Sequence, residues 1–240
     1  MYLSIKLMKA YFNFIYNPVY DITTGRLIPY RRLQEKCVDK LELKDKDRIL
    51  CVGLGTGNEV TRILEMNRNV DIVGIDYSHT ALQKAYRKAL TLDKEIVVFT
   101  MDARCLKFTT GSFDAVMCIH VMDFVAENKK VTSEILRVLK DRGQFVITYP
   151  SQKEGMSLGL NLWRDIIRNN PDAGRHRVIV FLKAVIQMLA SIIYLPLFLR
   201  SKKISYSHNE LQEMITRLMA GNLQIEEDPV YQDYIVYGRK

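Results

Sequence analysis

Between residues 48 and 150 the sequence alternates short apolar runs with helical stretches, and this alternation restricts the fold more than any other feature. The apolar runs are rich in β-branched residues, which is typical of buried strands. Strands that alternate with helices predict βαβ units, and therefore a parallel sheet with helices on both faces. The expected strands are 48–55, 70–76, 95–102, 113–121 and 143–150, with helices at 58–66, 78–91 and 129–140.

The C-terminal part follows a different pattern. Residues 208–221 carry apolar side chains at helical spacing and end at a glycine, so they predict a helix. Two strand-like runs, 223–231 and 233–240, then follow almost without a break. They predict an antiparallel hairpin that closes the sheet. The expected fold is therefore α/β: a Rossmann-like sheet of seven strands, mostly parallel, with a C-terminal antiparallel hairpin.

Residues 151–207 interrupt the alternation and predict an apolar helical insertion. The 240 residues otherwise fit one domain. Four parts are expected: an N-terminal helical cap over the pocket (1–44), a cofactor-binding core (45–150), the insertion (151–207), and a last helix with the closing hairpin (208–240).

The run VGLGTGNEV, residues 52–60, follows the first expected strand directly and enters a helix. Its glycines, Gly53, Gly55 and Gly57, follow the spacing G-x-G-x-G. Glycine allows the backbone to turn tightly and to approach a ligand, and the helix N-terminus offers free N–H groups. Dinucleotide-binding proteins prefer G-x-G-x-x-G, but Asn58 stands at the position of the last glycine. The loop therefore favours a nucleotide-like cofactor other than NAD or FAD.

Carboxylates end the next two expected strands. Asp76, at the end of the second strand, can accept both hydroxyls of a ribose. Asp102, at the end of the third, is placed to contact an adenine amino group. Alone, Asp76 could equally be a helix cap or a turn residue, and for Asp102 this alternative is the more frequent one. Their order after the glycine loop, on consecutive strand ends, favours a cofactor site.

At this point the sequence resembles the core of class I S-adenosylmethionine-dependent methyltransferases. The similarity is to the type that includes ubiquinone/menaquinone C-methyltransferases and bacterial phospholipid N-methyltransferases. The stretches that carry it are DRILCVGLGTGN, VGIDYSHTALQKA, MDARCLKF, GSFDAVMCIHVMDFV and EILRVLKDRGQFVIT, with YNPVYD at 16–21 upstream. These stretches lie within residues 45–150 and 16–21, which together make up about half of the chain.

The resemblance implies S-adenosyl-L-methionine as cofactor and S-adenosyl-L-homocysteine as product. It implies that the loop Gly53–Gly57 wraps the methionine part, that Asp76 binds the ribose, and that Tyr20 covers the pocket. Asp102 and Ala103 would frame the adenine. The expected cofactor-binding set is completed by Leu54, Tyr77 and Ile119. No metal site is expected.

One residue departs from the family pattern. The family carries Glu or Asp two residues before the first glycine, where this chain has Cys51. A thiol cannot provide the same charged acceptor, so this position weakens the expected contact with the methionine amino group.

Methyl transfer from a sulfonium is an in-line displacement, so the protein must chiefly align donor and acceptor. A general base is needed only where the acceptor loses a proton. His120, at the end of the fourth expected strand, and Asp123, just after it, lie at the sheet edge where ligands bind and are candidates together with Tyr16. The alternatives are that His120 only shapes the pocket, that Asp123 caps the next helix, and that Tyr16 packs in an N-terminal helix.

Residues 178–199, within the insertion, are apolar except for a narrow polar stripe, and basic residues flank them. A spanning helix needs about 20 apolar residues, and Pro196 shortens this one. A membrane-surface helix and a helix buried in a lid are the competing interpretations. The amphipathic, basic N-terminal segment favours the membrane surface, although it could also pack over the pocket.

The formal net charge is +8, which favours anionic partners. We therefore expect a cytoplasmic enzyme, peripherally bound to the inner face of the membrane, that methylates a lipophilic acceptor. This acceptor would be a phospholipid or aminolipid head group, or a prenylated quinone-like ring.

Three alternatives stay open. The first is a soluble small-molecule methyltransferase whose insertion is a buried lid or builds a homodimer interface. The second is a nucleic-acid-modifying methyltransferase, which is disfavoured because CIHV stands where a base-methylating signature would be. The third is a non-catalytic cofactor-binding subunit. Cysteine spacing excludes a zinc site of the common type, and Cys51 and Cys118 are expected in the core.

Overall fold

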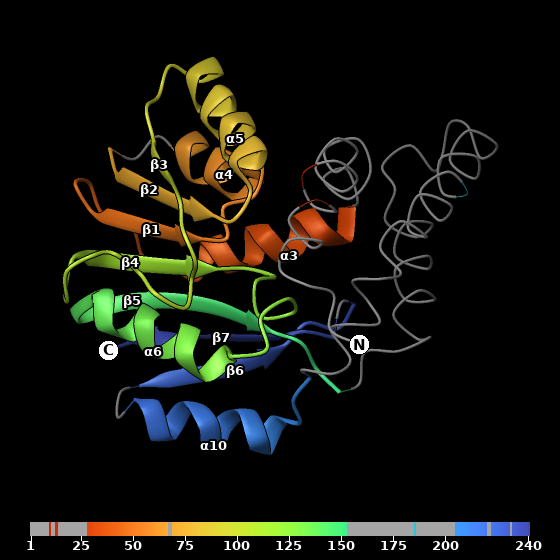
Figure 1. Cartoon of the computed structure of the whole chain (residues 1–240). Helices are drawn as coiled ribbons and strands as arrows, with labels where there is room; N and C mark the ends of the chain where they lie inside the picture. The colour runs from red at the N-terminus through yellow and green to blue at the C-terminus, as the bar shows by residue number, and fades with distance from the viewer. Residues whose placement is uncertain are drawn as a thin grey trace.

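The structure is a computed structural model that describes residues 10, 13, 28–66, 69–152, 185, 205–219, 222–230 and 232–240. A seven-stranded sheet in the order β3-β2-β1-β4-β5-β7-β6 lies at its centre (Figure 1). The strands are β1 (Arg48–Val52), β2 (Asp71–Asp76), β3 (Val97–Thr100), β4 (Phe113–Cys118), β5 (Leu139–Tyr149), β6 (Leu223–Glu227) and β7 (Tyr234–Arg239). The helices are α3 (Ile28–Asp39), α4 (Asn58–Glu65), α5 (His79–Thr91), α6 (Asn128–Val138) and α10 (His208–Leu218).

The predicted parallel sheet and closing hairpin are confirmed. Strands β1 to β5 pair in parallel, and β7 pairs antiparallel with both β5 and β6. Several boundaries differ from the expectation. The third strand is only Val97–Thr100, the fourth ends at Cys118, the sixth ends at Glu227 and the last helix ends at Leu218. The first strand ends at Val52, because Gly53 and Gly55 turn the backbone at positive φ. The fifth begins at Leu139, which pairs with Phe113, so it takes over the end of the helix expected at 129–140.

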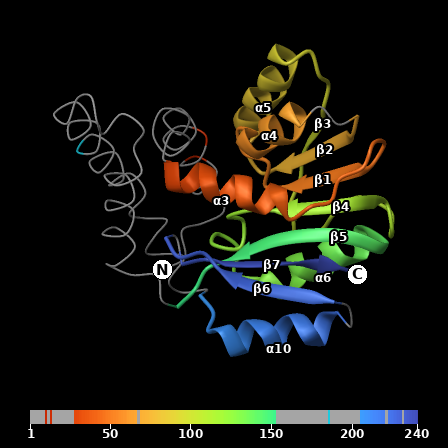
Figure 2. The same ribbon diagram turned by 180° about the vertical axis from the view of Figure 1, so that it is seen from behind.

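Helices cover both faces of the sheet (Figures 1 and 2). One apolar cluster joins α3, α4 and α5 to side chains such as Ile49, Cys51 and Met117. The other joins α6 and α10 to their sequence neighbours, such as Leu50 and Cys118. Adjacent residues alternate between the two clusters because successive side chains of a strand point to opposite faces. The described helix α3 of segment 1–44 thus belongs to one helical layer of the core.

The order of strands places a topological switch point between β1 and β4. The chain leaves β1 toward β2 and β3, and then crosses back to β4 on the other side of β1. Ligands of open α/β sheets bind at such a point, beyond the carboxyl ends of the strands. The loops that follow β1 and β4 therefore build the candidate site.

Within the part of the chain that the structure describes, no helix is long and apolar enough to cross a membrane. The apolar run 178–199 lies outside the described residues except for position 185, and so do Tyr16 and Tyr20.

Candidate functional site

The loop between β1 and α4 has the backbone that its glycines predict. Gly53, Gly55 and Gly57 adopt φ values of 71°, 55° and 78°, in the left-handed region that favours glycine. A Cβ on Gly53 would lie 2.1 Å from Cγ2 of Val121, and one on Gly57 would lie 2.8 Å from Cβ of Ala85. The loop is therefore packed between the β4 loop and α5, and only glycine fits at both ends of it.

Asp76 ends β2 and supports this loop. Its Oδ2 accepts a hydrogen bond of 2.8 Å from the N–H of Gly55, and its Oδ1 accepts one of 2.7 Å from the N–H of Ser78. Burial raises the pKa of Asp76 above its usual range in spite of these bonds. The helix cap of α5 is Ser78, whose Oγ accepts from the N–H of Ala81, so Asp76 is not the cap that the alternative interpretation assumed.

The described Asn13 lies beside the same strand end. Its Oδ1 accepts hydrogen bonds from the hydroxyls of Ser78, at 2.5 Å, and Thr80, at 3.1 Å. One residue of the N-terminal segment is therefore located next to the carboxylate expected to bind the ribose.

Asp102, at the end of β3, is held by Arg104. The guanidinium donates to both carboxylate oxygens, with Nη2 2.7 Å from Oδ2 and Nε 3.0 Å from Oδ1. This pairing lowers the pKa of Asp102. Asp102 is therefore ionised at neutral pH and fixed in orientation at the edge where an adenine would lie.

Glu59 places a carboxylate in the first turn of α4, directly after the glycine loop. The residue is only 7% exposed, and its Oε2 accepts a hydrogen bond of 3.1 Å from Nε2 of Gln34 on α3. Burial raises the pKa of Glu59 to about 7, and the charges of His120 and Lys88 oppose this rise only in part. Its charge also contributes to the raised pKa of the Cys51 thiol, after burial. A carboxylate, that of Glu59, thus lies near Cys51, the position at which this chain lacks the acidic residue of the family pattern.

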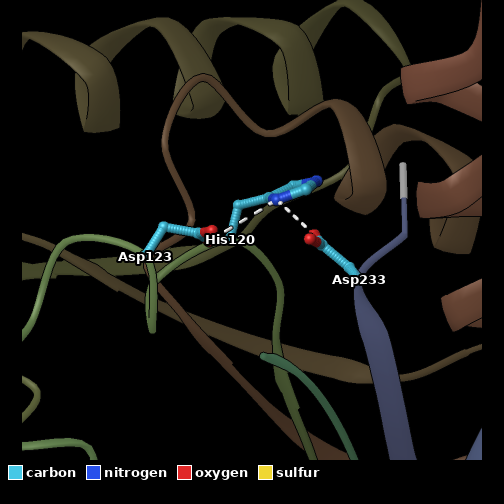
Figure 3. A group of neighbouring side chains, drawn as sticks. All are labelled: His120, Asp123 and Asp233. Carbon is cyan, nitrogen blue, oxygen red and sulfur yellow. Dashed lines mark ion pairs between the residues drawn. The ribbon is translucent and has the colours of Figure 1, made fainter. Parts of the chain in front are cut away.

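His120 follows β4, and two buried carboxylates face it (Figure 3). Its Nδ1 is 3.2 Å from Oδ2 of Asp233 and 3.6 Å from Oδ2 of Asp123. The ring stacks on Tyr30 of α3, with 4.9 Å between ring centroids. The backbone N–H of His120 donates to Oγ1 of Thr148, which holds the residue at a φ of 56°.

The two carboxylates decide the charge of the imidazole. Burial by itself would lower the pKa of His120, but Asp123 and Asp233 outweigh it and raise the pKa to about 10. With these groups alone, His120 is an imidazolium at neutral pH and cannot accept a proton. Asp123 does not cap the next helix, because α6 begins at Asn128 with Glu127 at the cap position.

The remaining expected cofactor residues lie at the same edge in different environments. Leu54 is 1% exposed and its side chain packs over Gly74, so only its backbone is available at the loop. Ile119 is buried, Ala103 is half-buried and Tyr77 is 38% exposed.

Two residues at the site were not predicted from the sequence. Asp233 precedes β7, and because β7 runs antiparallel to β5 its first residues lie at the carboxyl ends of the parallel strands. An aspartate at the first position of the last expected strand, 233–240, was the available signal. Glu59 had a weaker one, a carboxylate in an apolar helix face directly after the glycine loop.

These features define the class of the protein: a Rossmann-like α/β domain with a glycine loop and strand-end carboxylates at its switch point. Residues 50–147 match the family model described as a methyltransferase domain, so this core is similar to the domains of that family. The fold and the relatives indicate S-adenosylmethionine as its cofactor.

Two curated relatives are similar over this core. Demethylmenaquinone methyltransferase of Thermus thermophilus is 31% identical over 142 residues, which are 58% of this chain and 64% of the relative. Phosphatidylethanolamine N-methyltransferase of Cereibacter sphaeroides is 36% identical over 102 residues, 42% of this chain and 49% of the relative. The chain thus spans less than two thirds of the length of either relative.

Among solved structures, the fold is similar to that of a SAM-dependent methyltransferase from Aquifex aeolicus. The TM-score is 0.57 at 16% identity, over 86% of this chain and 88% of that one. At this identity the likeness concerns the fold alone, and it confirms the predicted Rossmann-like architecture.

Proposed function

We propose that the protein is an S-adenosylmethionine-dependent methyltransferase acting on a lipophilic acceptor. The observation that carries the enzymatic part is the glycine loop supported by the Asp76 carboxylate, at the switch point of a methyltransferase-type sheet. In this proposal the loop 53–57 holds the methionine part of the cofactor and Asp76 binds the ribose. Asp102 and Ala103 frame the adenine, with Leu54, Tyr77 and Ile119 around them and Tyr20 over the pocket.

The lipophilic acceptor is supported by three independent facts. The similar curated proteins are named for methylation of a menaquinone precursor and of a phospholipid. The net charge of +8 favours an anionic surface. The apolar run 178–199 with basic flanks has the composition of a membrane-surface helix. We infer that the protein works peripherally at the cytoplasmic face of a membrane.

The acceptor would approach the sulfonium past the loop that follows β4. His120 and Asp123 are therefore the substrate-side residues in this proposal, with Tyr16 as a third candidate. As an imidazolium, His120 would orient an acceptor oxygen by donating a hydrogen bond, and it would not act as the base at neutral pH.

Cofactor binding is tested by titration calorimetry with S-adenosylmethionine. We expect binding by the wild type and a loss of at least about tenfold in affinity for Asp76→Asn, since one amide oxygen cannot replace two charged acceptors. Asp71→Asn, at the exposed opposite end of the same strand, is the matched control and should bind as the wild type does. The absence of heat with the wild type would contradict the proposal.

The acceptor class is tested with cofactor labelled in the methyl group. Vesicles that contain phosphatidylethanolamine, vesicles that contain a prenylated demethylquinol, and water-soluble amines and phenols are offered separately. Label in the lipid fraction, from vesicles that the protein also binds in a flotation assay, is the expected result. Full turnover of a water-soluble acceptor by a protein that does not float with vesicles would favour the soluble alternative.

A further inference from the structure

Three side chains from separate segments converge beyond the carboxyl ends of the strands. His120 comes from the end of β4, Asp123 from the loop after it, and Asp233 from the segment before β7 (Figure 3). One ligand-capable atom of each, an imidazole nitrogen or a carboxylate oxygen, lies within 4.8 Å of the other two. This convergence depends on the tertiary fold, because Asp233 is reached only through the closing hairpin.

The two buried carboxylates share a single basic partner, the imidazole of His120. Asp233 is 1% exposed and Asp123 is 7% exposed. Neither oxygen of Asp233, nor Oδ2 of Asp123, accepts a hydrogen bond from any residue that the structure describes. No lysine or arginine of the described chain forms an ion pair with them, and one imidazole faces both. Buried carboxylates of this kind are paired with cations or coordinate metals.

The separations fit three donors on one metal ion. Donors at bond lengths of about 2.0–2.2 Å lie about 2.8–3.1 Å apart in octahedral coordination and about 3.3–3.6 Å apart in tetrahedral coordination. The observed distances from Nδ1 are 3.2 Å and 3.6 Å, and the longer one exceeds the range of a hydrogen bond. We propose that His120, Asp123 and Asp233 bind a divalent first-row transition-metal ion, of the Mn²⁺ or Zn²⁺ type. The ion would replace the proton that the imidazole carries in its absence, so binding would release a proton and the ion would take over the orienting role of the imidazolium.

The donor set selects this class of ion. One imidazole and two carboxylates suit Mn²⁺, Fe²⁺ and Zn²⁺, whereas Ca²⁺ needs six to eight oxygen ligands. Three protein donors leave coordination positions for water or for an oxygen of the methyl acceptor. Val121, next to His120, touches the loop at Gly53, so the ion would lie on the acceptor side of the cofactor loop. It would orient an oxygen-bearing acceptor rather than hold the cofactor.

Metal binding is tested on the full-length chain without cofactor or acceptor. The protein is stripped with a chelator, incubated with Mn²⁺ or Zn²⁺, passed through a desalting column and analysed for metal content. We expect about one equivalent retained by the wild type, an increase in Tm on adding metal, and an altered Mn²⁺ paramagnetic resonance spectrum. Asp233→Asn and Asp123→Asn should lose at least about tenfold in affinity. Asp114→Asn, on β4 but at its other end, is the control and should retain the metal.

The thermal stability of the variants also distinguishes a metal site from a purely structural ion pair between His120 and the two carboxylates. If the two carboxylates together need a metal ion, the metal-free site holds two negative charges against one imidazolium. Asp233→Asn removes one of these buried negative charges, so its Tm in chelator should equal or exceed that of the wild type. If the wild type retains no metal after incubation with millimolar Mn²⁺ or Zn²⁺, the proposal is overturned. A lowered Tm of Asp233→Asn in chelator, or unchanged metal retention by both variants, would also overturn it. Calorimetry with S-adenosylmethionine distinguishes these results from failure of the proposed enzymatic function.

Discussion

At the scale of single residues, Glu59 combines an unfavourable environment with a position that function explains. A carboxylate that is 7% exposed loses most of its hydration, and the described side chain that hydrogen-bonds to it is the neutral amide of Gln34. Proteins retain such costs at sites where activity requires them. The methionine part of the cofactor carries an ammonium group, and Glu59 lies in the first turn of α4, directly after the loop expected to hold it. We therefore interpret Glu59 as compensation for the missing acid at Cys51.

The first prediction concerns the stability of Glu59→Gln. Because the folded pKa of about 7 is above the ordinary 4.5, the folded state binds more protons than the unfolded state between these values. The contribution of Glu59 to stability therefore falls as pH rises through this window. Removing the charge should leave the free energy of unfolding unchanged below about pH 4 and raise it by up to about 3 kcal/mol above about pH 8. Urea denaturation at the two pH values measures the difference, and Glu65→Gln, exposed on the same helix, should show neither effect.

The second prediction concerns the function of the same substitution. If the carboxylate accepts the cofactor ammonium, Glu59→Gln should bind S-adenosylmethionine about tenfold more weakly at about pH 8, since a hydrogen bond to a charged group contributes about 1.5–3 kcal/mol. Adding Cys51→Glu to this variant should restore part of the affinity. Calorimetry on the variants gives both values, and unchanged binding by Glu59→Gln would reject the interpretation.

At the scale of elements, the glycine loop depends on its contact with α5. Gly57 is the N-cap of α4 at a φ of 78°, and the space for its side chain is taken by Ala85. Lys88, one turn further along α5, donates to Oδ1 of Asn58 at 2.7 Å and so ties the helix to the end of the loop. Helices α4 and α5 therefore determine the loop conformation together.

A double-mutant cycle at this contact makes the third prediction. Gly57→Ala adds left-handed strain of about 1–2 kcal/mol and places its Cβ 2.8 Å from that of Ala85. Ala85→Gly alone should cost about 1 kcal/mol of helix stability. The double variant should be more stable than the sum of the single effects by about 1 kcal/mol, because the steric part is relieved and the backbone strain is not. If the changes in the free energy of unfolding of the two single variants add up to that of the double variant, the contact between residues 57 and 85 does not determine the cost of Gly57→Ala.

The sequence predicted those parts of the site that local patterns carry. Gly53, Gly55 and Asp76 follow strands that hydrophobic periodicity reveals, so their meeting at one sheet edge could be inferred. Asp233 could not be placed beside His120, because that contact depends on the register of β7 against β5 across a long insertion. The start of β5 was missed for a similar reason. Leu139 follows helical spacing, and only its pairing with Phe113 makes it a strand residue.

At the scale of the whole molecule, the net charge and the apolar run 178–199 both favour the proposed association with a membrane surface. In the proposed peripheral association, a surplus of +8 would attract the chain to anionic lipid, with about 1 kcal/mol for each basic residue near the surface. The apolar side chains would then enter the membrane–water interface, and their contribution to the binding free energy does not depend on salt. The two contributions can therefore be separated by ionic strength, since the screening length falls from about 10 Å at 0.1 M to about 3 Å at 1 M.

The fourth prediction follows from this separation. Flotation with vesicles that contain anionic lipid should capture the protein at about 0.1 M salt and much less of it at about 1 M, whereas neutral vesicles should capture little at either. Lys202→Gln with Lys203→Gln, beside the apolar run, should reduce capture at low salt. Lys44→Gln with Lys46→Gln removes the same charge from exposed positions before β1, at the opposite edge of the sheet from the candidate site, and should not. Equal losses in the two double variants would mean that only the total charge attracts the protein to lipid, and that residues 178–203 do not direct it there.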